Sequence, residues 1–140
     1  MGQEHKPLPE GVHTVVLGMG DLNGLLRGKR IPAENWANIC ESGMAMSNAT
    51  FAIDMTCDVW DTPYTNWDTG YPDMHVMPIG EVHPIPWEEG VVYSFAEVVG
   101  ADHQPLAIDP RAALVRVLQK AAAMGYEVRI GTELEFYLLD

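Results

Sequence analysis

The stretch Gly131-Thr132-Glu133-Leu134-Glu135-Phe136-Tyr137-Leu138 alternates polar and apolar side chains. Successive side chains of a β-strand point to opposite faces, so this pattern predicts a last strand over residues 126–139. One face then carries Glu133, Glu135 and Tyr137, and the other carries Leu134, Phe136 and Leu138. A strand with an apolar face and two open edges needs neighbours, so we expect this stretch to belong to a larger fold.

A helix is predicted directly before this strand. Asp109 is suited to the N-cap, Pro110 to the first helical position and Gly125 to the C-terminal end. An apolar stripe runs along the helix through Leu114, Val117, Leu118 and Ala121. The chain therefore ends in a helix followed by a strand.

The N-terminal part has the signals of a hairpin and a short helix. We expect a strand over residues 12–17, a turn at residues 21–24 and a returning strand over residues 25–31. Pro32 then opens a helix over residues 33–41, which stops at Ser42-Gly43. Strand character returns at Thr50, Phe51 and Ile53.

The middle of the chain combines a long loop with one clear strand. Residues 54–73 have no clean period, and a loop of that length predicts a site or a subunit contact, with Trp60 and Trp67 buried under another element. Prolines at positions 78, 84 and 86 argue against a central strand over residues 77–87. Residues 91–99 are predicted to form a strand.

Charge and cysteine content exclude several classes of protein. Eight Lys and Arg stand against 20 Asp and Glu, so the formal net charge is −12, which disfavours nucleic acid and anionic membranes as partners. Two cysteines, Cys40 and Cys57, are too few for a disulfide scaffold and are expected to be small buried residues. Without a membrane-spanning segment or signal peptide, a cytoplasmic location is expected.

The basic residues are confined to the two ends of the chain. Residues 31–110 contain no Lys or Arg, although that stretch is rich in Asp and Glu. A solvated acidic surface explains this pattern, and so does attraction of a cationic amine or a divalent metal ion.

Glu133 and Glu135 are the candidate metal ligands. Two carboxylates separated by one residue on a strand stand roughly 6.5–7 Å apart, a spacing that suits two adjacent divalent ions. Carboxylate oxygens are the ligands that Mg²⁺ and Mn²⁺ prefer. Taken alone, the same Glu-x-Glu pattern is also common on the solvated face of a strand.

In context, residues 131–138 resemble the Gly-x-Glu-x-Glu-Phe-Tyr-Leu signature of the glutamine synthetase family. Similar segments recur in the family's order, particularly in its gamma-glutamylputrescine synthetase-like branch of glutamate–amine ligases. They are Asp21-Leu22-Asn23-Gly24, Arg27-Gly28-Lys29-Arg30-Ile31-Pro32, Phe51-Ala52-Ile53-Asp54, Pro72-Asp73, Pro86-Trp87 and Asp109-Pro110-Arg111. The resemblance covers roughly residues 12–140.

The resemblance implies an α+β fold. It consists of a flexible lead (residues 1–11), a β-grasp domain with a mixed sheet (residues 12–105) and the truncated start of a catalytic domain (residues 106–140). It also implies a ligase that uses ATP to phosphorylate the γ-carboxylate of glutamate before an amine displaces phosphate. Glu133 and Glu135 would hold two Mg²⁺ or Mn²⁺ ions, in homo-oligomers of stacked rings with sites between subunits.

Departures from the family pattern favour an organic amine. Ammonia-using members carry Asp-Gly-Ser-Ser where this chain has Ser47-Asn48-Ala49-Thr50, so the aspartate that helps to bind ammonium is replaced. A polyamine such as putrescine is the leading candidate, and a monoamine such as ethanolamine is its rival. His75, His83 and His103 have no metal-ligand spacing. No catalytic residue is assigned, because most of the expected active site lies beyond Asp140.

Other functions remain open at this point. Because most of the catalytic domain is missing, we expect the 140-residue chain to be inactive alone, as a natural truncation or a fragment. It is alternatively a non-catalytic β-grasp module for assembly or regulation, part of an ammonia-using glutamine synthetase, or a separate divalent-metal protein.

Overall fold

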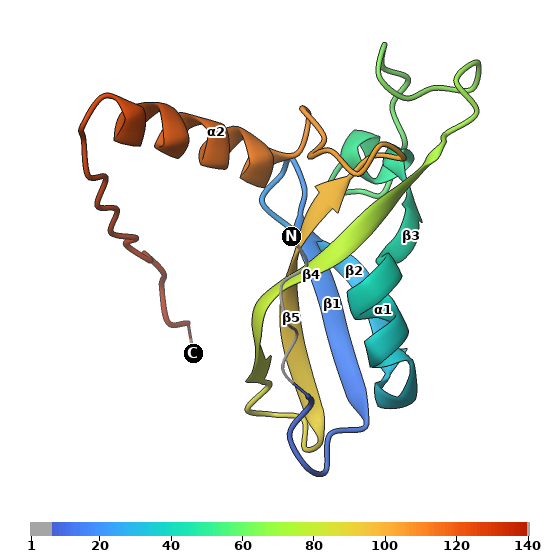
Figure 1. Ribbon diagram of the computed structural model, residues 1–140, viewed down its shortest axis with the longest axis vertical. Coiled ribbons are helices and arrows are strands. Elements are labelled where there is room, and N and C mark those ends of the chain that lie inside the picture. The colour runs from blue at the N-terminus through green and yellow to red at the C-terminus, as the bar shows by residue number, and fades with distance from the viewer. Residues whose placement is uncertain (1–6, 140) are drawn as a thin grey trace.

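The computed structural model describes residues 7–139. Its elements follow one another as β1 (Thr14–Gly20), β2 (Leu26–Pro32), η1 (Ala33–Asn35), α1 (Trp36–Ser42), β3 (Met44–Ser47), η2 (Asn48–Ala52), β4 (Asp73–Pro84), β5 (Val91–Val99) and α2 (Pro110–Ala123) (Figure 1). Both η elements are 3₁₀-helices. No helix in this part of the chain is long and apolar enough to cross a membrane.

The strands form one mixed sheet in the order β2-β1-β5-β4-β3. The central strands β1 and β5 run parallel, and the other neighbours are antiparallel. Lys29 on β2 donates from Nζ to the carbonyl oxygen of Ala45 on β3 at 3.4 Å, so the two outer strands approach each other. The sheet is therefore curled, and the predicted α+β class with a mixed sheet is confirmed.

The predicted hairpin is formed by β1 and β2. Its turn is closed by Asp21, whose Oδ1 accepts the N–H groups of Asn23 and Leu25, both at 2.8 Å. Gly24 adopts a φ of +78°, which a residue with a side chain rarely adopts. The turn is thus held by one side chain and one glycine.

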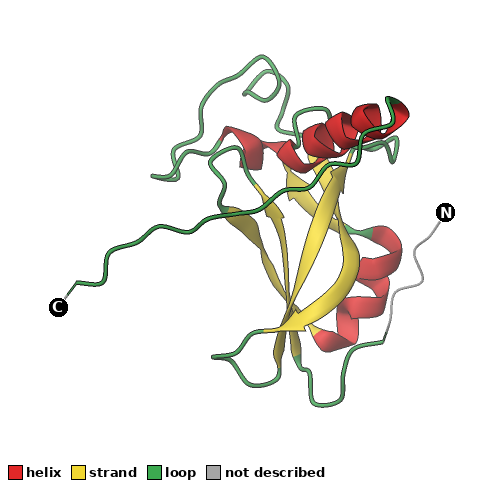
Figure 2. Ribbon diagram, turned by 90° about the vertical axis from the view of Figure 1, so that its left-hand side faces the viewer, coloured by secondary structure: helices red, strands yellow, loops and turns green. Residues whose placement is uncertain are grey.

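One face of the sheet carries the core, and α1 covers it (Figure 2). Trp36 on α1 is buried against Val15 and Val92, and Ile39 packs against both parts of the core. The helix ends at Gly43, whose φ is +75° and whose N–H bonds to the Ile39 carbonyl at 2.9 Å. The short helix was predicted, although its first residues are 3₁₀.

One expectation about strands is wrong and another is confirmed. Thr50 and Phe51 lie in η2 and are buried there, so the chain turns where a strand was expected. β4 runs through Pro78 to Pro84, but only its residues 75–76 pair with both β3 and β5; residues 77–84 pair with β5 alone, so they are not a central strand, as expected. β3 pairs only with residues 73–76 of β4, so one side of β4 is open from Pro78 onward. A proline that lacks an N–H on the open side interrupts no hydrogen bonds between strands.

The helix α2 forms as predicted. The Asp109 carboxylate accepts the N–H groups of Arg111 and Ala112 at 3.0 and 3.2 Å. At the other end, Gly125 has a φ of +83°, and the N–H of Tyr126 bonds to the Ala121 carbonyl at 3.0 Å. This pattern is a Schellman motif, which satisfies the last carbonyls of the helix.

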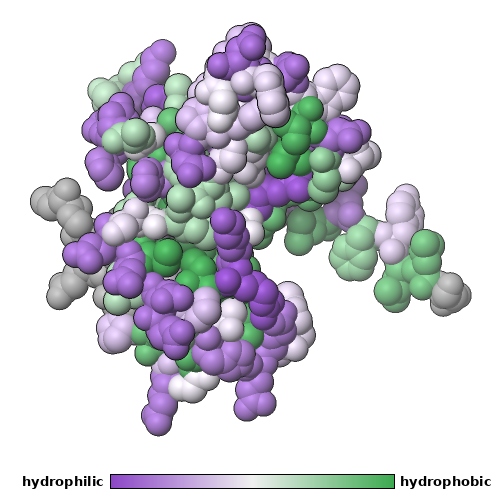
Figure 3. All heavy atoms as spheres, turned by 90° about the vertical axis from the view of Figure 1, so that its right-hand side faces the viewer, coloured by the Kyte–Doolittle hydropathy of each residue, from purple (hydrophilic) through white to green (hydrophobic). Residues whose placement is uncertain are grey.

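Residues 126–139 were expected to form a strand, and that expectation is wrong for this structure. The segment is extended but pairs with no strand among the described residues, and it runs beside the sheet without joining it (Figure 1). Its large apolar side chains are exposed, including Leu134 at 89% and Phe136 at 83%. In Figure 3 they project from the body as a group of apolar atoms. A single strand cannot satisfy its own backbone groups, so it needs neighbours that residues 7–139 do not supply.

Candidate functional site

Glu133 and Glu135 lie in the extended segment after α2, and both are exposed. Side chains two residues apart on an extended chain share one side at roughly 6.5–7 Å. Their hard oxygen atoms fit Mg²⁺ or Mn²⁺. Within residues 7–139 no group of three His, Cys, Asp or Glu residues is placed to hold a metal ion. The two carboxylates therefore fit as part of a metal site that needs further ligands.

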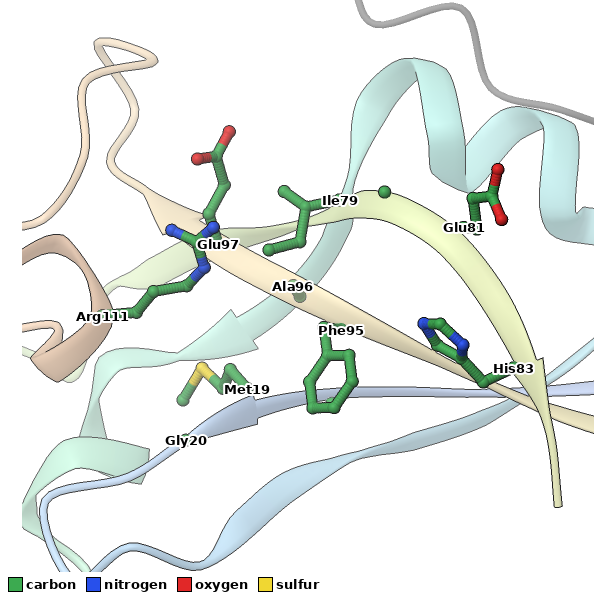
Figure 4. Close-up of a pocket in the computed structure, with 11 residues that line it drawn as sticks. Met19, Gly20, Ile79, Glu81, His83, Phe95, Ala96, Glu97 and Arg111 are labelled. Carbon is green, nitrogen blue, oxygen red and sulfur yellow. The ribbon is translucent and has the colours of Figure 1, made fainter. Parts of the chain in front are cut away.

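A pocket of about 590 Å³ lies on the sheet face opposite the main core (Figure 4). Its floor is open at Gly20 and Gly80, where an added Cβ would meet nothing within 4 Å, and Phe95 is 47% exposed there. Arg111 extends from the start of α2 toward Glu97 on β5.

At the other end of the pocket stand Glu81 and His83 from β4. The ring centroids of His83 and Phe95 are 6.1 Å apart at an interplanar angle of 66°. A cation, two carboxylates and an aromatic floor can bind a small polar molecule. The lining has no serine, cysteine, threonine or lysine that would act as a nucleophile.

A polar network ties the β1–β2 hairpin to the loop that follows η2. Arg27 donates from Nε to Asp21 Oδ2 at 2.8 Å and from Nη2 to the Asp54 carbonyl at 3.0 Å. Asn23 donates from Nδ2 to the Ile53 carbonyl at 3.0 Å. Burial raises the pKa of Asp21, but hydrogen bonds from Arg27 and from the backbone outweigh it, so the pKa is lowered.

Asp54 organises the beginning of the same loop. Its carboxylate accepts the Trp60 indole N–H at 3.0 Å and the Thr56 hydroxyl at 2.7 Å. The hydrogen bond from Trp60, followed by those from Thr56 and Asp58, lowers the pKa of Asp54 to about 2. The loop is therefore held by an ionised aspartate across the neutral pH range.

Residues 47–50, which the resemblance led us to expect in place of an ammonium-binding motif, have structural roles. Ser47 caps η2, accepting the N–H of Ala49 at 3.2 Å, and donates its hydroxyl to the Tyr71 carbonyl at 3.2 Å. Asn48 is 5% exposed and accepts the Thr65 hydroxyl at 2.5 Å. The segment thus anchors the loop, and it presents no carboxylate.

The loop between Ile53 and Asp73 contains no helix or longer strand, as predicted, apart from a single bridge between Ile53 and Val59. Trp60 and Trp67 were expected to be buried, and that expectation is wrong within the described residues, since they are 63% and 82% exposed. Trp60 is instead held at the surface by its own hydrogen bonds, from its indole N–H to Asp54 and from its backbone N–H to the Ala52 carbonyl.

The structure brings together two histidines that the sequence did not connect. His75 on β4 and His103 in the turn after β5 are stacked, with centroids 6.0 Å apart. The pairing of β4 with β5 creates this contact, and no local sequence signal indicates it. They belong to no metal-binding group of three among the described residues.

The cysteines differ from each other. Cys40 is half-buried against the part of the core around Trp36, and this burial raises its pKa to about 11, so the expectation of a buried residue is met in part. Cys57 is exposed, with a φ of 68° and its Sγ 3.9 Å from Arg27 Nη1, so the expectation of burial is wrong there. Both thiols are free.

The end of the chain matches a known family model. Residues 107–140 match the model described as glutamine synthetase, catalytic domain. Among curated proteins, the chain is 33% identical over 92% of its length to the glutamate–isopropylamine ligase of a Pseudomonas species. It is 35% identical over 89% of its length to gamma-glutamylethanolamide synthetase of Streptomyces coelicolor. It is 33% identical over 86% of its length to gamma-glutamylputrescine synthetase of Escherichia coli.

Solved structures agree with this similarity. Ligand-free GmaS superposes with a TM-score of 0.64 at 26% identity over 82% of this chain and 24% of that chain. A structure titled as a novel glutamine synthase homolog gives a TM-score of 0.67 at 17% identity over 86% of this chain and 28% of that chain, which is a likeness of fold. The chain spans 29%, 28% and 26% of the lengths of the three curated relatives.

Proposed function

Because the chain belongs to the glutamine synthetase family and matches its glutamate–amine ligases, we propose that it is the N-terminal part of such a ligase. The observation that carries the proposal is its identity of 33% to 35% with three relatives named for isopropylamine, ethanolamide and putrescine chemistry. These matches extend over most of the chain, including its N-terminal half.

The proposed reaction has two steps. An oxygen of the glutamate γ-carboxylate attacks the terminal phosphorus of ATP, and the bond to ADP breaks. The amine nitrogen then attacks the acyl carbon of γ-glutamyl phosphate, phosphate leaves, and the nitrogen loses a proton. The product is a γ-glutamyl amide.

Glu133 and Glu135 are the residues of this chain that we assign to metal binding. Two bound Mg²⁺ or Mn²⁺ ions supply charge neutralisation for the transferred phosphoryl group. The exposure of both carboxylates and their position on one side of an extended segment support this assignment. Because the segment lacks further acidic partners, the other ligands must come from the rest of the enzyme.

We assign residues 12–105 to a β-grasp domain and residues 106–140 to the start of the catalytic domain. The hairpin, the helix on one sheet face and the parallel pairing of the central strands support the first assignment. The family match over residues 107–140 supports the second. The lead, assigned to residues 1–11, falls partly outside the described residues.

An organic amine is the proposed co-substrate, with putrescine or another polyamine ahead of ethanolamine and other monoamines. Ser47 and Asn48 are bound to other parts of the chain and provide no carboxylate for ammonium. The stretch from Ile31 to Pro110 has no Lys or Arg, which supports attraction of a cation. The proposed enzyme acts in the cytoplasm as a homo-oligomer of stacked rings, and the isolated chain is inactive.

The test is phosphate release by the full-length enzyme with ATP, glutamate and a panel of putrescine, ethanolamine, isopropylamine and ammonia. We expect an organic amine to give the highest kcat/KM. Raising the salt concentration should weaken the apparent affinity for a diamine more than for a monoamine, because screening acts on each charge. Ammonia as the best substrate would contradict the amine assignment, and absence of glutamate-dependent phosphate release would contradict the ligase.

A further inference from the structure

Two aromatic rings form an open corner in the loop between η2 and β4. The centroids of Trp67 and Tyr71 are 6.3 Å apart, and their planes meet at 72°. Trp67 is 82% exposed, although its ring is among the largest apolar side chains in the chain. Two aromatic faces that meet at an angle offer negative electrostatic potential from two sides.

A carboxylate stands beside the corner. The Tyr71 hydroxyl donates to Asp61 Oδ1 at 3.4 Å. Burial and the neighbouring charge of Asp61 raise the pKa of Tyr71, so its ring stays neutral. Residues 31–110 contain no Lys or Arg, and among the described residues no cationic side chain forms an ion pair with Asp61.

The loop that carries the corner is held in place by its own hydrogen bonds. Thr62 and Thr65 bond to each other through backbone and side chain, and the Thr65 hydroxyl bonds to Asn48 under the loop. Asn66 and Thr69 bond to each other in the same way on either side of Trp67. A binding corner that is already ordered loses little entropy when a ligand binds.

We propose that Trp67, Tyr71 and Asp61 bind an alkylammonium group, with the cation on the aromatic faces and its charge opposite the carboxylate. Cations bind aromatic rings within about 6 Å of the ring centroid, and rings 6.3 Å apart can both contact one such group. The identification of this group with the amine co-substrate rests on the proposed ligase function. Binding of an alkylammonium ion at this corner does not depend on the ligase function.

The test is a titration of the chain with isopropylammonium chloride, followed by the indole N–H signals of its four tryptophans in NMR spectra. The chain carries Leu134→Ser, Phe136→Ser and Leu138→Ser, which remove these exposed apolar side chains from its C-terminal segment. The Trp67 signal should shift and saturate, whereas that of Trp87, which is 81% exposed in the turn before β5, should not. Sodium chloride at equal ionic strength is the control titration. Trp67→Leu should weaken binding on the order of fivefold, measured by calorimetry, which is the ratio expected for one exposed cation–π contact. Asp61→Asn should also weaken binding, because it removes the opposite charge beside the ammonium group.

Trp87→Leu is the matched control, because it removes an equally exposed ring elsewhere and should leave affinity unchanged. The proposal is overturned if sodium chloride shifts the Trp67 indole N–H signal as much as the amine does. It is also overturned if Trp87→Leu weakens binding as much as Trp67→Leu. If the amine binds saturably at Trp67 but the full-length protein releases no phosphate, the binding site is supported and the ligase function is contradicted. In an active full-length enzyme, Trp67→Leu should raise KM for the amine and leave KM for ATP unchanged.

Discussion

Arg27 and Asp21 form an ion pair across the turn of the β1–β2 hairpin, with Arg27 Nε 2.8 Å from Asp21 Oδ2. The Asp21 side chain is 1% exposed and the Arg27 side chain 19%. The same guanidinium bonds to the Asp54 carbonyl, so one arginine links the hairpin to the loop after η2. This link positions the loop relative to the sheet.

Asp21→Asn should lower the free energy of unfolding by about 1–3 kcal/mol, because it weakens buried hydrogen bonds that the carboxylate accepts. The pKa of Asp21 is lowered in the folded state, so its contribution is fully present above the unfolded pKa of about 4 and is lost as pH falls through the folded value. Urea unfolding of both proteins between pH 2 and 7 measures this. Asp68→Asn, at an exposed position, is the control, and an equal loss there would contradict the prediction.

Gly28→Ala should destabilise the hairpin severely, by at least about 2 kcal/mol. A Cβ at Gly28 would lie 1.9 Å from the Leu17 carbonyl oxygen, and the backbone cannot move away without breaking the β1–β2 ladder. Gly20→Ala is the matched control in the same hairpin, because nothing lies within 4 Å of its added Cβ. Equal thermal stability of the two variants would refute the predicted clash.

Asp109→Ala should cost about 1 kcal/mol, since it removes the N-cap of α2. Asp109→Asn should cost much less, because asparagine also caps and has no charge to bury. Burial raises the pKa of Asp109, so in the wild type the stability from this group falls as pH rises from the unfolded pKa through the raised folded value. The asparagine variant should lack this pH dependence, which chemical denaturation at pH 3 to 7 tests.

Glu133→Gln and Glu135→Gln should each weaken Mn²⁺ binding and lower kcat in the full-length enzyme, with metal-free stability unchanged or slightly higher. Two nearby carboxylates repel each other without the metal, so removing one charge relieves that repulsion. Calorimetry with Mn²⁺ and thermal unfolding in a chelator measure the two effects. If the two variants keep their Mn²⁺ affinity but lose stability without metal, Glu133 and Glu135 have a structural role instead.

The isolated chain should self-associate through residues 126–139. Leu134, Phe136 and Leu138 are 83% to 93% exposed, and both edges of the extended segment are open. Replacing these three residues by serine should give a monomer in size-exclusion chromatography. A compact wild-type monomer whose amides in residues 126–139 are protected from hydrogen exchange would rule this out.

Several elements were predictable because their determinants are close together in the sequence. Asp109, Pro110 and Gly125 mark the two ends of α2, and the turn at residues 21–24 joins two strands that follow each other directly in the sequence. The resemblance around Glu133 and Glu135 also indicated the family. The candidate metal ligands were thus named from sequence, but their remaining partners were not.

Other features depend on contacts between distant residues. Pro78 argued against a central strand, because proline has no N–H to donate to a neighbouring strand. The sequence of β4 does not show where β3 ends, so it does not show that residues 75–76 pair on both sides. The Trp67–Tyr71 corner depends on how the loop closes over Asn48. The hydrogen bond from Arg27 to the Asp54 carbonyl also joins residues that are 27 positions apart, so no local sequence pattern indicates it.

The sequence by itself determined the hairpin, α2 with both its ends, the C-terminal end of α1, strand β5 and the family of the chain, because caps, turns and alternation act within a few residues. Only the tertiary structure decided that residues 75–76 of β4 pair with both β3 and β5, that Thr50 lies in a buried 3₁₀ turn and that residues 126–139 remain unpaired. The physical reason is that a backbone N–H or carbonyl is satisfied by whichever partner reaches it. For a strand, that partner comes from a distant part of the chain, and for residues 126–139 it is absent from the described residues.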